Sequence, residues 1–330
     1  MSSWGPLPGA EMVRLLVGPN KREFTIHKKL LCASSSFFRY SLESASSEPS
    51  SPSSVESDSG AVSTFHSEKL IWLSEECPEM MELFVLWLYQ RNSFRMTLEQ
   101  KVAAVTVAPN PANRAKILNN RRQLHWNLVK LHLFAAVIRL PVLQDVAMDA
   151  IQDLYLRCDW DVSQNFVRFL YEECTREQAF RLRKWAVAML AWTLSNNSGD
   201  PLAFNELFDE FPELQWDFSK HMEKMDDSRA DYCVKNPQLR LPRNKLKNEE
   251  RQFGFRQCSF HSHRSSVGEG RCPYAVDQPE SPSKDSFGSR PSHAEVKSSF
   301  SKATTKQKRH ARLKSSTSQI WTVQESAEET

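Results

Sequence analysis

Glycine is scarce in this chain, with 9 residues in 330. Folds that hold nucleotides in glycine-rich phosphate loops are therefore disfavoured, and neither a Gly-x-Gly-x-x-Gly run nor a Gly-Lys-Ser/Thr step occurs. The nucleophile motif Gly-x-Ser-x-Gly and the zinc-protease motif His-Glu-x-x-His are missing as well. Because no catalytic signature is present, we expect a protein that is not an enzyme.

Long hydrophobic runs are also missing. The longest, Trp185 to Trp192, is far shorter than the roughly 20 residues that cross a membrane. The first residues, MSSWGPLPGAEM, show no basic stretch followed by an apolar core, so we expect an intracellular protein, in the nucleus or cytoplasm, with no membrane partner. The cysteines are odd in number and scattered, which is a poor disulfide framework and fits a reducing compartment. They are Cys32, Cys77, Cys158, Cys174, Cys233, Cys258 and Cys272.

Charge is distributed unevenly along the chain. Hydrophobic residues make up 40% and charged residues 25% of the whole, which is typical of a soluble protein with one sizeable core. Residues 1–235 carry 26 Lys+Arg against 30 Asp+Glu, a net charge of −4. Residues 236–330 carry 17 against 10, a net charge of +7, so a mildly acidic body precedes a basic C-terminal part.

The stretch from Val13 to Leu42 organises the first part of the chain. An apolar run, a break at Gly18-Pro19-Asn20 and an alternating run around Phe24-Thr25-Ile26 predict two short strands joined by a turn. From His27 onward the apolar residues follow helical spacing, with the serines at 34–36 as an interruption. We therefore expect a hairpin followed by two short helices with a serine-rich joint.

This stretch is similar to the opening of a BTB (POZ) domain, in which a strand ending Phe-x-Val-His precedes a Lys-x-Leu-Leu helix and a Ser-x-Phe-Phe helix. Further along, Leu86-Trp87-Leu88-Tyr89 resembles the family's Trp-Leu-Tyr helix end, and the form Phe84-x-x-Trp87-Leu88-Tyr89 is similar to that of the fungal branch. Phe134-Ala135-Ala136 and the run from Leu140 to Ala150 resemble its closing helix pair. The residues that carry the motif as structural positions are Phe24, His27, Lys28, Leu31, Phe37, Phe38, Trp87 and Tyr89. Of these, we assign His27 to packing and helix capping.

The resemblance implies an α/β (α+β) fold of the BTB kind, in which short helices flank a small mixed sheet. We divide the chain into an N-terminal tail at 1–12, the BTB-like domain at 13–157, a helical extension at 158–235 and a mostly disordered basic tail at 236–330.

Two segments interrupt the expected domain. Within the insertion at 44–66, the stretch Ser44 to Ser59 holds 9 serines in 16 residues and too little apolar surface to offset the entropy of ordering it. We expect it to be a disordered loop. The segment 91–125 replaces a short connection of the family, and we interpret it as a second insertion. Its prolines and basic residues favour a solvated loop, with contact to an acidic partner as the alternative.

A cluster of metal-binding residue types lies in the tail, with the spacing Cys-x2-His-x-His-x8-Cys. Thiolates and imidazoles are the ligands that zinc prefers in four-coordinate structural sites. On a regular strand His261 and His263 would face opposite ways, so both bind one ion only if the chain turns between them. The pattern predicts a structural zinc at Cys258, His261, His263 and Cys272, with accidental clustering as the alternative. We expect no other cofactor.

A basic run, KQKRHARLK, follows near the C-terminus. Such a run acts as a nuclear-import signal, contacts nucleic-acid phosphates without sequence preference, or is simply solvated. Its basic residues are Lys306, Lys308, Arg309, Arg312 and Lys314.

Together these features predict a protein–protein interaction module. The resemblance implies a BTB-type scaffold that binds protein partners and pairs with a second copy of itself as a homodimer. One alternative is a substrate adaptor of a cullin-type ubiquitin ligase, although no repeated substrate-reading module is visible. A second alternative is a nuclear regulator that uses the basic run to associate with nucleic acid.

Overall fold

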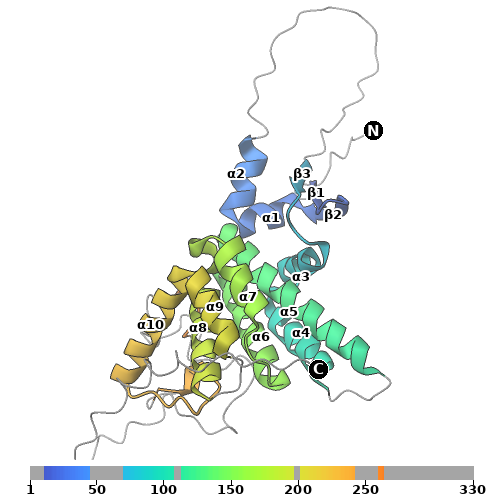
Figure 1. Ribbon diagram of the computed structural model, residues 1–330. Coiled ribbons are helices and arrows are strands. Elements are labelled where there is room, and N and C mark those ends of the chain that lie inside the picture. The colour runs from blue at the N-terminus through green and yellow to red at the C-terminus, as the bar shows by residue number, and fades with distance from the viewer. Residues whose placement is uncertain (1–10, 45–69, 108–112, 197–200, 242–258, 264–330) are drawn as a thin grey trace, which may run out of the picture. The chain divides into compact units, whose positions relative to one another are not determined.

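Helices dominate the part of the chain that the computed structural model describes, which comprises residues 11–44, 70–107, 113–196, 201–241 and 259–263. The described residues also form a small three-stranded mixed sheet, whose strands come before and after the first two helices (Figure 1). This confirms the α+β organisation that the sequence predicts, with a small mixed sheet and many helices.

The sheet has the strand order β2-β1-β3. Strand β1 (Met12–Val17) pairs antiparallel with β2 (Arg22–His27) and parallel with β3 (Leu70–Leu73). Every second residue of β1 from Val13 is buried, as expected for a strand with one face against the core. The turn after β1 requires glycine, because Gly18 has φ 74° and a Cβ there would lie 3.2 Å from the Glu76 carbonyl oxygen.

The two predicted short helices follow the hairpin as α1 (Lys28–Ser34) and α2 (Ser36–Ser44). Ser35 forms the joint between them. It is buried, and its hydroxyl donates a hydrogen bond to the carbonyl oxygen of Ile138 at 2.8 Å. The serine at this joint therefore fastens the helix pair to the end of a helix about 100 residues further along the chain.

Helix α3 (Pro78–Tyr89) begins with proline in its first turn, where the missing N–H is tolerated. Cys77 caps it, since its sulfur accepts a hydrogen bond from the Met80 N–H at 3.4 Å. The side chains of α3 are buried on most sides, as its uniformly apolar sequence predicts.

The interpretation of residues 91–125 as a solvated loop is wrong. The segment forms α4 (Arg91–Thr106) and the first half of α5 (Arg114–Val137), with Phe94, Leu98 and Leu124 in the core. Arg121 of α5, one of the basic residues that suggested a loop, is buried against the C-terminal end of α4. Its guanidinium donates to the carbonyl oxygens of Val105 and Val107 at 2.6 and 3.1 Å, and so caps that helix.

Helices α6 (Pro141–Cys158) and α8 (Arg176–Ser195) form the centre of the helical part, and α5 packs along α6 (Figure 1). Between α6 and α8 lie α7 (Gln164–Arg168) and a π-helical turn (Phe169–Glu173). Thr175 caps the start of α8, because its hydroxyl oxygen accepts a hydrogen bond from the Gln178 N–H at 3.4 Å. Trp185 is the largest fully buried side chain among the described residues, and the centroid of its ring lies 4.7 Å from that of Tyr155.

Helices α9 (Pro201–Glu210) and α10 (Pro212–Asp227) complete the helical region predicted at 158–235. Beyond residue 235 the structure also describes two short parts of the tail, at 236–241 and 259–263. A 3-10 turn (Pro237–Leu239) is buried, and Gln238 donates to the Gln152 side chain at 2.6 Å. The adjoining Arg240 has 0% exposure. Residues 259–263 also pack against the helices.

Several predictions fall outside the described residues: the serine-rich stretch within 44–66, Cys258, Cys272 and the basic run Lys306, Lys308, Arg309, Arg312 and Lys314. Within the described ranges, no helix is both long and apolar enough to cross a membrane.

Candidate functional site

The two histidines of the predicted metal cluster come together in the structure. Residues Ser259 to His263 form turns rather than a strand, and this places both imidazole rings on the same side, with centroids 5.3 Å apart. The turn that the metal hypothesis requires between His261 and His263 is therefore present.

Helix α6 supplies two carboxylates to the same place. Asp145 and Asp149 lie one helical turn apart, so their side chains share a face of the helix. His261 Nε2 lies 2.9 Å from Asp149 Oδ1, and His263 Nδ1 lies 3.2 Å from Asp145 Oδ2. The Ser262 N–H donates to Asp145 Oδ1 at 2.5 Å, so side chains and backbone together hold residues 261–263 against α6.

Both carboxylates are almost completely buried, at 3% and 1% side-chain exposure, and buried charge must be compensated. Arg95 of α4 lies 3.4 Å from Asp149, and Arg181 of α8 donates to the Ser262 carbonyl oxygen at 3.3 Å. Burial lowers the pKa of Arg181, and the nearby Asp145 opposes this. The site thus gathers carboxylates, guanidiniums and imidazoles from three helices and the 259–263 segment.

His132 of α5 lies near Arg181 and His261 of this site. It is buried at 1% exposure. Burial lowers its pKa to about 3, and the charges of Arg181 and His261 act in the same direction. His132 is therefore neutral at physiological pH.

Three of these groups fit a metal ion. Asp145, His261 and His263 each offer one ligand atom, and the three atoms lie within 4.8 Å of one another. Sequence reasoning found the two histidines and missed Asp145, because it lies more than 100 residues earlier. The available signal was a pair of acids one turn apart, Asp145 and Asp149, inside a helix whose buried positions are mostly apolar.

The BTB-motif residues divide into buried and exposed groups. Leu31, Phe38 and Trp87 are in the core, Phe24 is half-buried, and Phe37 and Tyr89 are exposed at 36% and 47%. His27 occupies the N-cap position of α1, but its side chain makes no capping hydrogen bond, so that part of its assignment is wrong. Its Nδ1 lies instead 2.7 Å from the Tyr89 hydroxyl. Lys28 pairs with the Glu11 carboxylate at 2.8 Å.

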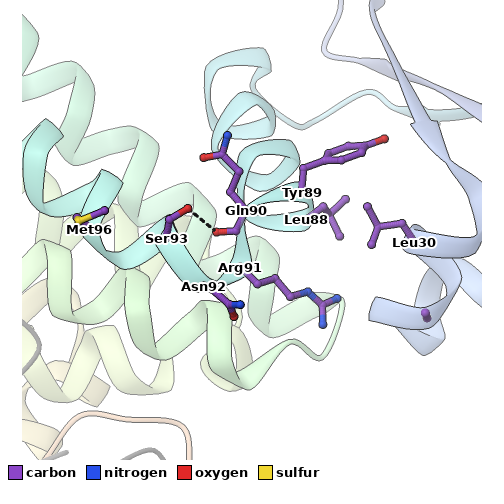
Figure 2. Close-up of a pocket in the computed structure, with 9 residues that line it drawn as sticks. Leu30, Leu88, Tyr89, Gln90, Arg91, Asn92, Ser93 and Met96 are labelled. Carbon is purple, nitrogen blue, oxygen red and sulfur yellow. Dashed lines mark hydrogen bonds between the residues drawn. The ribbon is translucent and has the colours of Figure 1, made fainter.

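An open groove of about 810 Å³ lies between α1 and the junction of α3 with α4. Figure 2 shows Leu30 and Leu88 facing each other across it, with Tyr89 beside them. Met96 extends the apolar lining along α4 and is 57% exposed. Arg91 borders the groove with its guanidinium 4.6 Å from the centre of the Trp87 ring, and Gln90, Asn92 and Ser93 also line it. The groove is therefore mostly apolar, with a polar and cationic edge.

Comparison with known proteins does not extend this description. No family model matches the chain, and no curated protein or solved structure matches it.

Proposed function

We propose that this chain is a non-enzymatic interaction module of the BTB/POZ kind that pairs with a second copy of itself. The resemblance of residues 13–157 to that family supports the proposal. The observation that carries it is the contrast between the two edges of the sheet.

Strand β2, one edge, begins with Arg22 and Glu23 and ends with the exposed His27. Charged residues of this kind protect a sheet edge from pairing with another chain. Strand β3, the other edge, reads LIWL and carries no charge. Leu70 and Trp72 are each 54% exposed, and among the described residues no strand pairs with the outer edge of β3. An uncharged apolar edge favours a partner strand.

A second copy of the chain is the partner that fits this edge. A two-fold axis perpendicular to the sheet brings an edge strand antiparallel to its own copy, which joins two three-stranded sheets into one of six strands. In the register with β1, Trp72 lies opposite Leu16 and Leu70 opposite Arg14. The pairing would therefore place the apolar Leu70 and Trp72 of the two copies on the same face of the joined sheet, beside Leu16 at one position and Arg14 at the other.

The test is the mass of the full chain by light scattering across a concentration series. We expect a dimer for the wild type and a monomer for Trp72→Lys, because a lysine on β3 blocks edge pairing. Trp216→Lys on α10 is the matched control, since Trp216 is exposed to a similar degree at 60%, and it should remain dimeric. Deletion of residues 45–66 should also leave the dimer intact. A monomeric wild type, or a dimer that Trp72→Lys leaves unchanged, contradicts the proposal.

A second candidate, an adaptor for a cullin-type ubiquitin ligase, is favoured by the groove between α1 and the α3–α4 junction. Amphipathic helices bind to grooves with apolar lining, and the resemblance suggests a cullin helix as the occupant. Copurification of a cullin with the full chain, lost in Met96→Arg and kept in Trp216→Lys, would support this function. Absence of a cullin from the purified wild type would exclude it.

A further inference from the structure

The Asp145, His261 and His263 side chains have the spacing of ligands around one ion. Ligands at about 2.05 Å from a tetrahedral zinc lie about 3.3 Å from one another. Asp145 Oδ2 lies 3.2 Å from His263 Nδ1 and 3.9 Å from His261 Nδ1, distances that bracket this separation. The longer distance is beyond the reach of a direct hydrogen bond.

The groups around these ligands orient them as in known metal sites. A metal-binding histidine usually donates its other ring N–H to a carboxylate, which fixes its tautomer and its ring plane. His261 has this arrangement, since its Nε2 lies 2.9 Å from Asp149 Oδ1 while its Nδ1 points to Asp145. A hydrogen bond orients Asp145 as well. The Ser262 N–H donates to its Oδ1, and its Oδ2 faces both imidazoles.

We propose that Asp145, His261 and His263 bind one zinc ion, which fastens residues 259–263 to helix α6. Two imidazole nitrogens and one carboxylate oxygen suit zinc and not calcium or magnesium, which prefer oxygen ligands alone. His263 retains 16% side-chain exposure, so an ion can reach the site from solvent. The site differs from the Cys-His set predicted from the sequence in having a carboxylate of α6 as a ligand. It does not depend on the proposed pairing of two chains.

The first test is the metal content of the full chain, purified without a histidine tag or chelator. We expect about one zinc per chain in the wild type and loss of most of it in Asp145→Asn and His263→Ala. Asp153→Asn is the matched control, since it makes the same change two turns further along α6 and should keep the zinc. Retention of full zinc content by both ligand variants would overturn the assignment.

The main readout of the second test uses the wild type and does not depend on how the variants fold. Chelator-treated wild-type protein is titrated with Co²⁺, which reports its ligands by visible absorption. We expect tetrahedral d–d bands that saturate at about one equivalent and are displaced by Zn²⁺. No such bands would overturn the proposal. Strong thiolate charge-transfer absorption that persists in Asp145→Asn would also overturn it, because the ion would then be held by cysteines rather than by Asp145.

Discussion

The sheet and the helical core differ in where their apolar and charged side chains lie. On the sheet, the apolar Leu70 and Trp72 are exposed, while charged side chains pair across its surface. In the core, charged groups such as Asp149 and Arg240 are buried among helices and are held by specific partners. Buried polar groups cost free energy unless they are paired, so they fix how the core helices and the 236–241 and 259–263 segments pack. The exposed apolar groups of the sheet are free to contribute to association.

The sharpest test of this contrast compares two tryptophans. Trp185→Ala should lower the free energy of unfolding by about 3–5 kcal/mol, because it leaves a cavity among buried aromatic rings. Trp72→Ala should cost only about 1 kcal/mol, the value of its hydrogen bond to the Gly18 carbonyl oxygen and its contact with Lys21. Urea denaturation followed by circular dichroism measures the two values, at a protein concentration low enough that both variants are monomeric. Equal losses would contradict the distinction between core and sheet surface.

Arg240 tests whether the buried charge of the core is structural. Its guanidinium donates to the carbonyl oxygens of Ala188, Val234 and Lys235 at 2.6, 2.8 and 3.1 Å. Burial lowers its pKa to about 10, so it stays charged at neutral pH. Arg240→Leu leaves these acceptors unsatisfied and should lower the free energy of unfolding by about 2–4 kcal/mol.

The control for this change is Arg122→Leu, which replaces an exposed arginine of α5 and should be close to neutral in urea denaturation. If Arg240→Leu is as stable as Arg122→Leu, residues 236–241 do not contribute to the core.

Arg240 also shows where sequence reasoning reached its limit. The hairpin of β1 and β2 and the paired helices α1 and α2 depend on neighbouring residues, and the sequence predicted them. Residues 91–125 were misread as a loop, and the packing of 236–241 was not predicted, because the order of both depends on distant contacts, such as Arg240 with Ala188. The same limit applies to the candidate site. His261 and His263 were recognisable from local spacing, whereas Asp145 becomes their neighbour only when the chain folds.

His125 provides a pH-dependent test of the core. It lies among aromatic rings, with Nε2 3.1 Å from the Tyr155 hydroxyl, and burial lowers its pKa to about 4. Between pH 6.5 and 4 the unfolded chain therefore binds a proton that the folded chain does not. The stability from neutral His125 is complete above pH 6.5 and is lost as pH falls, by up to about 3 kcal/mol.

His125→Gln should flatten this dependence, because glutamine does not titrate. Thermal melts across this pH range measure the effect. His132 and His221, whose pKa values burial lowers to about 3 and about 4, should maintain a smaller slope of the same sign in the variant. An unchanged slope in His125→Gln would mean that its imidazole is protonated in the folded protein.

The smallest effect is expected on the sheet surface, at the ion pair of Arg14 and Glu23. Both Nε and Nη2 of Arg14 donate to the Glu23 carboxylate at 2.7 Å, and these hydrogen bonds lower the pKa of Glu23. The stability that the pair contributes is present above the ordinary pKa of Glu23 and is lost as pH falls through the lowered value. Because both side chains are exposed, solvent and salt screen the pair, and Arg14→Gln should barely change the melting temperature.

The same variant should still raise the pKa of Glu23 toward its ordinary value, which an NMR pH titration of the carboxyl group detects. Glu223, whose pKa is lowered by Lys220, is the internal reference and should not change. Since the Glu23 pair contributes little to stability and lies on a charged strand, its loss should also leave association unaffected. A large drop in melting temperature on loss of Arg14 would mean instead that charge on the sheet supports the fold as buried charge does in the core.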